Sequence, residues 1–320
     1  MNVKEDLQID KIIEILKTKN IIIDVIKIYQ KYDRIIDYLI NNEFILSISK
    51  EIMTVQIKHN RINSVLFVPK VHYSGDFEYL NQKYYFYITD YLKGNNLWSE
   101  ITKLTNEQKI NIGKDIVKFF NELHSITGNS YDIGHYIPTI PNCMKTWKNG
   151  HIEYIDLLKS ELYKMDFSLN AKQIISKAFN YIYENLNSLE YQIGARILHN
   201  DFHPKNIIIS EGKLIGIIDW ECSQFGEPDF ELVHLFHWCI YPSDSNNDIE
   251  LLLKYVVENL QSFQKVPDIE KRLTIYQLEH DLNQLIWNGI KQENERIQKI
   301  NGWLDGKINV LFNKWKIYSI

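Results

Sequence analysis

The chain has 320 residues, 45% of them hydrophobic and 24% charged, with a net charge of -5. This length exceeds the size at which a single hydrophobic core usually stops growing, so we expect two lobes. The mild acidic balance argues against a nucleic-acid partner, which would require a basic surface. Three scattered cysteines without a CxxC pair argue against a disulfide framework and against a zinc site.

The N-terminal residues and the hydropathy pattern predict a cytoplasmic protein. Glu5 and Asp6 stand where a secretory signal needs a basic and then an apolar run. No apolar run approaches the ~20 residues that cross a membrane. We therefore expect no membrane partner, and either a monomer or a weak dimer.

Runs of β-branched and aromatic residues dominate the first part of the chain, after a segment with helical spacing at 7–17. Asn41-Asn42-Glu43 provides a hairpin turn, and a helix is expected at 51–66. The pattern predicts a five-stranded segment with one helix inserted after the third strand. The strand-like runs are 21–23 with 25–28, 35–40, 44–48, 70–74 and 84–89.

Helical spacing dominates after the loop signal Lys93-Gly94-Asn95-Asn96. A strand-rich island interrupts the helices at 207–209 and 214–218. We therefore predict an α+β fold, with an N-terminal nucleotide-binding lobe at 1–91 and a larger, mainly helical lobe at 92–320. The expected helices are 106–126, 145–165, 171–187, 229–240, 247–264, 268–291 and 295–315.

One stretch of the second lobe carries the chemistry. His199–Asn206 reads HNDFHPKN and matches the kinase catalytic-loop spacing H-x-D-x-x-x-x-N, and Asp219 follows an apolar strand further on. Phosphoryl transfer needs a carboxylate that orients the acceptor hydroxyl and takes its proton, a role that suits Asp201. It also needs oxygen ligands for Mg²⁺, and these roles suit Asn206 and Asp219. We interpret His203 as a packing or loop residue.

These motifs resemble those of the aminoglycoside phosphotransferase and choline kinase group of protein-kinase-like enzymes. Leu198–Asn206 resembles the family's catalytic loop, and Ile218–Leu232 resembles its metal-binding strand and the stretch after it. Phe120–Ile126 and Tyr87–Gly94 are similar to a helix end after the lobe boundary and to the hinge. The resemblance is strong over 84–126 and 195–236. It implies a bilobal protein-kinase-like fold, whose small N-terminal lobe has a five-stranded antiparallel sheet and a helix.

The resemblance also implies how a nucleotide would bind. Backbone groups of Thr89, Asp90 and Tyr91 would meet the purine edge. Ile208 and Ile218 would form the apolar floor beneath the purine.

Further roles are implied for charged and polar residues of the second lobe. His199 would be structural and brace the catalytic loop, and Asp229 would be structural and tie the following helix to that loop. Glu221 would lie near the acceptor and contact a cationic substrate. Glu279 and Asp281, on one expected helix, are further candidates for substrate binding, with a solvated helix face as the alternative.

The N-terminal lobe departs from the family pattern. The position where the family places a lysine on the third strand is Ser47, and no glycine precedes Gly75, so a glycine-rich phosphate loop is absent. Lys58 would fall on the following helix, where Glu51 is the candidate for the usual acidic partner. Ordinary residues at 31–37 would have to cover the nucleotide.

We therefore expect a kinase that uses Mg²⁺ and ATP or GTP to phosphorylate an alcohol group of a small cationic acceptor. By family analogy the first expectation is an aminoglycoside, which would make the protein an antibiotic-resistance enzyme. Choline, another amino alcohol, a sugar or a macrolide are alternatives within the same chemistry. An alternative from another class is a pseudokinase-like binding protein, which Ser47 and the missing glycines motivate.

Overall fold

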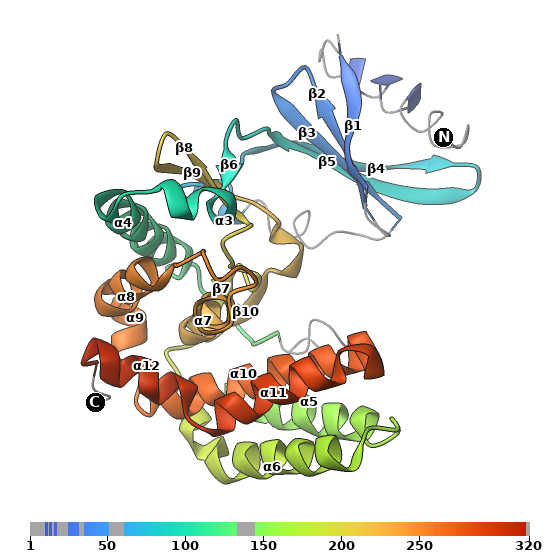
Figure 1. Ribbon diagram of the computed structural model, residues 1–320. Coiled ribbons are helices and arrows are strands. Elements are labelled where there is room, and N and C mark those ends of the chain that lie inside the picture. The colour runs from blue at the N-terminus through green and yellow to red at the C-terminus, as the bar shows by residue number, and fades with distance from the viewer. Residues whose placement is uncertain are drawn as a thin grey trace. The chain divides into compact units, whose positions relative to one another are not determined.

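The computed structural model describes residues 10–11, 13–14, 16–17, 25–31, 35–50, 61–132 and 145–317, and the chain forms two compact units (Figure 1). Unit 1 comprises Met1–Gly94 with Ile215–Glu221, and unit 2 comprises Asn95–Leu214 with Cys222–Ile320. The first division therefore falls after Gly94, near the predicted boundary at 91. The segment Ile215–Glu221, which we had placed in the second lobe, packs with unit 1.

Unit 1 is built around a five-stranded antiparallel sheet with the strand order β1-β2-β3-β5-β4. The strands are β1 (Ile26–Lys31), β2 (Ile35–Ile40), β3 (Phe44–Ser49), β4 (Val71–Tyr79) and β5 (Gln82–Asp90). The five predicted strands are confirmed, although β4 and β5 are longer than expected and meet at a two-residue turn. Both turn residues, Leu80 and Asn81, have positive φ, the conformation that such tight hairpins require. The run at 21–23 and most of the helix at 51–66 lie outside the described residues.

The two faces of this sheet differ in character because successive side chains of a strand point to opposite faces. Tyr38, Leu46 and Phe86 belong to one buried apolar cluster, which also contains Leu16 from the N-terminal helical segment. The neighbouring positions Asp37, Ser47 and Tyr87 are paired across β2, β3 and β5. A polar group therefore lies on the sheet face opposite the apolar cluster.

Unit 2 is mainly helical and is organised around α10, whose residues from Arg272 to Glu279 are all buried. Helices α5, α6, α7, α11 and α12 pack against α10 (Figure 1). Within the described residues, no helix is both long and apolar enough to cross a membrane. The helices are α3 (Leu97–Glu100), α4 (Asn106–Leu123), α5 (Trp147–Leu162), α6 (Leu169–Asn185), α7 (Val233–Ile240), α8 (Glu250–Asn259), α9 (Gln261–Gln264), α10 (Ile269–Asn288), α11 (Glu293–Leu304) and α12 (Lys307–Trp315).

The strand-rich island predicted at 207–209 and 214–218 is confirmed as β8 (Ile207–Ser210) and β9 (Lys213–Ile217). Two short strands, β7 (Arg196–Leu198) and β10 (Gln224–Gly226), were not predicted. Strand β7 pairs with β10, and β8 lies between β6 (Asn95–Asn96) and β9.

Two predicted helices are each divided in the structure. The helix expected at 295–315 is interrupted at Gly306, whose φ of 82° is a left-handed conformation that glycine adopts without strain. The helix expected at 247–264 is divided at Leu260 into α8 and α9, because Leu260 has extended rather than helical backbone angles. The predicted helix at 229–240 starts as a 3-10 turn at Pro228–Leu232, and α7 follows it.

Candidate active site

The catalytic-loop sequence begins where β7 ends, and one buried carboxylate holds its first residues. Glu231, which is almost fully buried, accepts a hydrogen bond from the backbone N–H of His199 at 2.8 Å and from that of Asn200 at 3.1 Å. Asn200 has a left-handed backbone with φ of 62°, which an asparagine tolerates better than most residues. Sequence reasoning gave Glu231 no role, and its only signal was its place in the family-like stretch after Asp219.

His199 lies inside this loop and is fully buried. Its Nδ1 atom accepts a hydrogen bond from the backbone N–H of Asp201 at 3.3 Å, and its ring meets Phe202 edge to face. These contacts fit the predicted bracing role, because they fix the backbone on which the Asp201 side chain is mounted.

The Asp201 carboxylate is surrounded by imidazoles within unit 2. His203 Nε2 lies 3.6 Å from Oδ2, and His234 Nε2, from α7, lies 3.9 Å from Oδ1. Burial alone would raise the pKa of Asp201, but the imidazoles of His203, His234 and His199 outweigh it and hold this pKa at about 2. The carboxylate is therefore ionised at neutral pH. His203, which we interpreted as a packing or loop residue, and His234, which sequence reasoning missed, both take part in this environment.

Asn206 is oriented by Asp201. Its Nδ2 donates to the backbone carbonyl of Asp201 at 2.9 Å and to the Oδ2 atom of the same residue at 3.1 Å. Since both partners are acceptors, the amide nitrogen must face them, and Oδ1 is the atom that remains for a metal ion. Asn206 directly precedes β8, which is the neighbour of β9 in the sheet.

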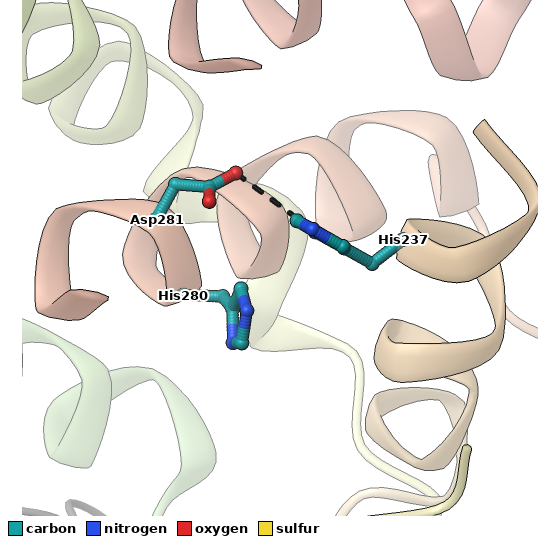
Figure 2. Close-up of side chains that lie close together, drawn as sticks. All are labelled: His237, His280 and Asp281. Atoms are coloured by element: carbon teal, nitrogen blue, oxygen red, sulfur yellow. Dashed lines mark ion pairs between the residues drawn. The ribbon is translucent and has the colours of Figure 1, made fainter. Parts of the chain in front are cut away.

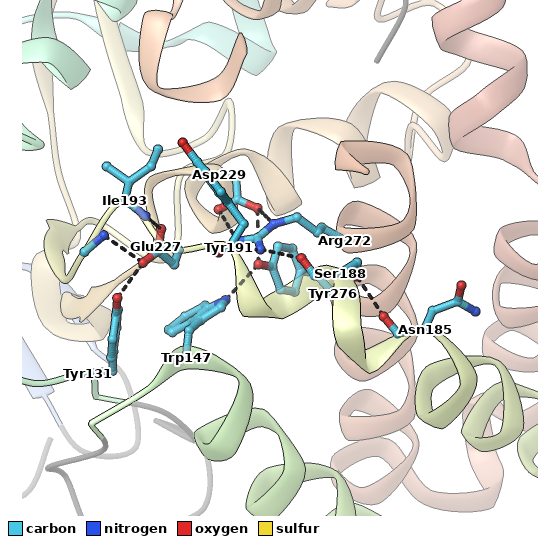
Figure 3. Close-up of polar contacts among 11 residues, drawn as sticks. Tyr131, Trp147, Asn185, Ser188, Tyr191, Ile193, Glu227, Asp229, Arg272 and Tyr276 are labelled. Carbon is cyan, nitrogen blue, oxygen red and sulfur yellow. Dashed lines mark hydrogen bonds and ion pairs between the residues drawn. The ribbon is translucent and has the colours of Figure 1, made fainter. Parts of the chain in front are cut away.

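Behind the loop, Asp229 forms a buried ion pair with Arg272 of α10 (Figure 3). Arg272 Nε donates to Oδ2 at 2.6 Å and Nη2 donates to Oδ1 at 2.9 Å, and the Tyr276 hydroxyl donates to Oδ2 at 3.2 Å. The expectation that Asp229 ties the next helix to the catalytic loop therefore needs correction. Its carboxylate anchors this region to α10, and Glu231 holds the loop.

A second buried acid stabilises the approach to β7 (Figure 3). Glu227 accepts hydrogen bonds from the Tyr131 hydroxyl at 2.5 Å and from the backbone N–H groups of Ile193 and Gly194 at 2.8 and 3.0 Å. Burial raises the pKa of the Glu227 carboxyl. Together with the Asp229–Arg272 ion pair, these hydrogen bonds of Glu227 fix the chain before β7 and after β10, on both sides of the catalytic loop.

In unit 1, the position at which the family resemblance leads us to expect a lysine holds a polar cluster. The Ser47 hydroxyl donates to Asp37 Oδ1 at 2.5 Å, and the Tyr87 hydroxyl interacts with Ser47. Burial raises the pKa of Asp37 and, with the charges of Asp37, Asp219 and Glu221, raises the pKa of Tyr87 far above its usual value. The cluster of Asp37, Ser47 and Tyr87 contains a carboxyl group and no cation, whereas a phosphate clamp would need a cation. Lys58 and Glu51 lie outside the described residues.

The expected purine-binding segment is partly engaged by other backbone groups. The N–H of Asp90 donates to the Lys70 carbonyl at 3.2 Å, and the N–H of Tyr91 donates to the Glu43 carbonyl at 2.7 Å. The Asp90 side chain accepts the N–H of Lys70 and lies 2.6 Å from His72 Nε2. Thr89 belongs to the sheet, where it pairs with both neighbouring strands. Two N–H groups of this segment are therefore not available to a purine.

The remaining residues of the predicted site lie at the ends of β8 and β9. Ile208 is buried in β8, and Ile218 is partly exposed directly after β9. Asp219 follows with a φ of 68°, which is rare for a residue with a side chain and is often found at functional positions. The side chains of Asp219 and Glu221 are exposed.

Glu279 and Asp281 are buried and paired within unit 2. His151 Nδ1 donates to Glu279, with both carboxylate oxygens at 2.8 Å. Asp281 accepts from Arg296 Nη1 at 2.9 Å and from Trp303 Nε1 at 2.7 Å. Both carboxylates are thus shielded from solvent and hydrogen-bonded within unit 2. This fits neither the expected contact with a substrate nor the alternative of a solvated helix face.

The comparisons with known proteins agree with these motifs. Residues 50–251 match the model of the APH family, described as the phosphotransferase enzyme family. Since this match spans more than half of the chain, the chain belongs to the phosphotransferase enzyme family, and the predicted resemblance is confirmed. No curated protein matches the chain in sequence.

Solved structures show the same fold. A thermostable mutant of aminoglycoside phosphotransferase APH(4)-Ia, in a ternary complex with AMP-PNP and hygromycin B, is similar with a TM-score of 0.66 and 14% identity, over 92% of this chain and 97% of that chain. The streptomycin–ATP complex of APH(2″)-IIa has a TM-score of 0.63 and 20% identity, over 91% and 95%. ADP-bound APH(2″)-Ib has a TM-score of 0.59 and 20% identity, over 93% and 98%. The fold is therefore the α+β, protein-kinase-like fold expected from the sequence.

Proposed function

We propose that the protein is a small-molecule kinase that transfers the γ-phosphate of ATP or GTP to a hydroxyl group of a cationic acceptor, first of all an aminoglycoside. The observation that carries this proposal is the geometry of the catalytic loop, in which the Asp201 backbone N–H donates to His199 and the Asn206 side chain donates to the Asp201 carboxylate. The similar solved structures include complexes with hygromycin B, streptomycin and gentamicin, which support an aminoglycoside as the acceptor.

The electrostatics of Asp201 define its part in the reaction. A carboxylate with so low a pKa is a weak base, so its main effect is to accept a hydrogen bond from the acceptor hydroxyl and to orient that oxygen toward phosphorus. Phosphoryl transfer proceeds through a loose transition state in which the hydroxyl proton leaves late, so a weak base suffices. The proton passes to Asp201 as the new O–P bond forms and the bond between the γ-phosphorus and the leaving nucleoside diphosphate breaks.

The chemistry of the donor atoms fits Mg²⁺. Asn206 offers Oδ1 because its nitrogen is used by Asp201, and Asp219 offers an exposed carboxylate. Both are oxygen ligands of the kind that Mg²⁺ prefers, and the ion, when bound, neutralises charge on the phosphates. We assign the metal roles to these two residues, and an acceptor contact to the exposed Glu221.

The nucleotide contacts need one revision. We keep Ile208 and Ile218 as the apolar surface for the purine, and the carbonyl groups of Thr89, Asp90 and Tyr91 as acceptors for it. The N–H groups of Asp90 and Tyr91 are used within unit 1, so we no longer assign either of them as a donor to the purine.

An acceptor panel tests the proposal. The full chain is incubated with Mg²⁺, ATP or GTP, and hygromycin B, streptomycin, gentamicin, choline or a macrolide. The mass of the acceptor and the release of ADP or GDP are measured. Asp201→Asn is expected to lower kcat by about 10²–10⁴-fold. Asp166→Asn, which changes an exposed carboxylate, is the matched control and should retain activity. Wild-type protein that modifies no acceptor with either nucleotide would overturn the enzyme proposal.

A binding protein without efficient turnover is the second candidate. The Ser47–Asp37 pair favours it because, among the residues that the structure describes, no cation pairs with this position. A rise in melting temperature with Mg·ATP or Mg·GTP, combined with no transfer to any acceptor, would support this function. Absence of a thermal shift with both nucleotides would argue against both candidates.

A further inference from the structure

Three potential metal ligands from two helices converge inside unit 2 (Figure 2). His237 belongs to α7, and His280 and Asp281 are consecutive residues of α10. One ligand atom of each lies within 4.8 Å of the other two, and His237 Nδ1 lies 3.9 Å from Asp281 Oδ2. We propose that His237, His280 and Asp281 form a binding site for a transition-metal ion that prefers imidazole ligands, such as zinc(II).

The first argument is an unsatisfied nitrogen. The His237 side chain is only 9% exposed, and among the described residues its Nδ1 atom has no hydrogen-bond partner. Buried polar atoms are almost always paired, because an unpaired one loses its hydration without compensation. A metal ion bound between His237 and Asp281 would give this nitrogen a partner.

The second argument is the fixed position of the carboxylate. Asp281 is held by Arg296 on Oδ1 and by Trp303 on Oδ2. Outer-shell donors of this kind orient ligating carboxylates in metal sites. The ligand set contains two imidazoles and a single carboxylate. It therefore disfavours Mg²⁺ and Ca²⁺, which need several oxygen ligands, and favours ions that bind imidazole.

The third argument is the spacing of the ligand atoms. Zinc–ligand bonds of about 2.0–2.1 Å place neighbouring ligand atoms roughly 3.4 Å apart. His237 Nδ1 and Asp281 Oδ2, which are 3.9 Å apart, must therefore approach by about half an ångström, and the pairs that include His280, which lie within 4.8 Å, by at most about 1.4 Å.

The scattered cysteines led us to expect no zinc site, and the present proposal departs from that expectation. The cysteine pattern contains no information about histidines that come together from separate helices. Of the three proposed ligands, His280 is the partly exposed one.

A competing location must be separated from this one. Asp201, His203 and His234 also lie close together, and an added ion could bind there. Replacement of Asp201 removes that alternative without changing the proposed ligands, and replacement of His72 removes a histidine of unit 1 as a further control.

Cobalt(II) and zinc(II) binding to the full chain tests the proposal. After treatment with a chelator and dialysis, the protein is titrated with cobalt(II). Visible absorption follows the binding of cobalt(II) in a tetrahedral site, and zinc(II) is then added to displace the cobalt. We expect the wild type, Asp201→Asn and His72→Gln to bind one equivalent of cobalt(II). The affinity for cobalt(II) should be lower by about tenfold or more in His237→Gln and His280→Gln. Melting curves without metal check folding, and the partly exposed His280 decides the outcome if the His237 variant does not fold. Absence of uptake by the wild type, equal binding by His280→Gln, or loss of binding in Asp201→Asn would overturn the proposal.

Discussion

Asp229→Asn is expected to destabilise unit 2 far more than Asp268→Asn, although each acid pairs with a residue of the first turns of α10. The side chains of Asp229 and Arg272 are 0% exposed, and two hydrogen bonds of 2.6 and 2.9 Å join them. The asparagine leaves the buried guanidinium without a counter-charge, which costs about 3–5 kcal/mol. Asp268 and Lys271 form a pair of 2.7 Å whose side chains are 50% exposed, so solvent screens it and its loss costs at most about 1 kcal/mol.

Urea unfolding followed by circular dichroism, which reports mainly the helices of unit 2, measures the difference. A double replacement, Asp229→Leu with Arg272→Met, should be less destabilising than the sum of the two single changes, because no charge is left unpaired. Equal unfolding free energies for Asp229→Asn and Asp268→Asn, or strict additivity in the double variant, would refute the reasoning.

Three further predictions address the two units. Glu231→Gln is expected to lower kcat by about tenfold to a hundredfold, because one of the two loop N–H groups loses its acceptor and the loop can shift; unchanged kcat in a folded variant would contradict the clamp. Ionised Asp201 contributes stability that is present above its unfolded pKa near 3.9 and is lost as the pH falls through its folded pKa of about 2. Acid-unfolding curves of Asp201→Asn should therefore show a smaller loss of stability between these pH values than the wild type. Asp37→Asn is expected to tighten Mg·ATP binding by about threefold or more, because it removes an acidic group at the phosphate-clamp position. Calorimetry measures the affinity, and Asp76→Asn, which replaces an exposed acid, should leave it unchanged.

The catalytic loop could be predicted from the sequence because its chemistry is local. Asp201 and Asn206 are separated by four residues, and the turn between them brings the amide of one to the carboxylate of the other. The strands of unit 1 could also be predicted, because their runs of β-branched and aromatic residues favour strand conformation.

Other parts of the candidate site depend on contacts between residues far apart in the chain. Glu231 holds the loop from about thirty positions away, and Arg272 rather than the loop takes the carboxylate of Asp229. The burial of Glu279 and Asp281 could not be predicted from helical spacing either, because α10 is covered by neighbouring helices on several sides and its hydrophobic pattern is weak.

The sequence by itself therefore determined the phosphotransferase family and the fold, because short motifs and runs of strand-forming residues are encoded by neighbouring residues. It also led to the prediction that Ser47 stands at the third-strand lysine position. Only the tertiary structure revealed that Ser47 is paired with Asp37, that imidazoles from two segments surround Asp201, and that His237 meets His280 and Asp281. The physical reason is that the charge and the hydrogen-bond partners of a buried group are set by whichever distant segments pack against it.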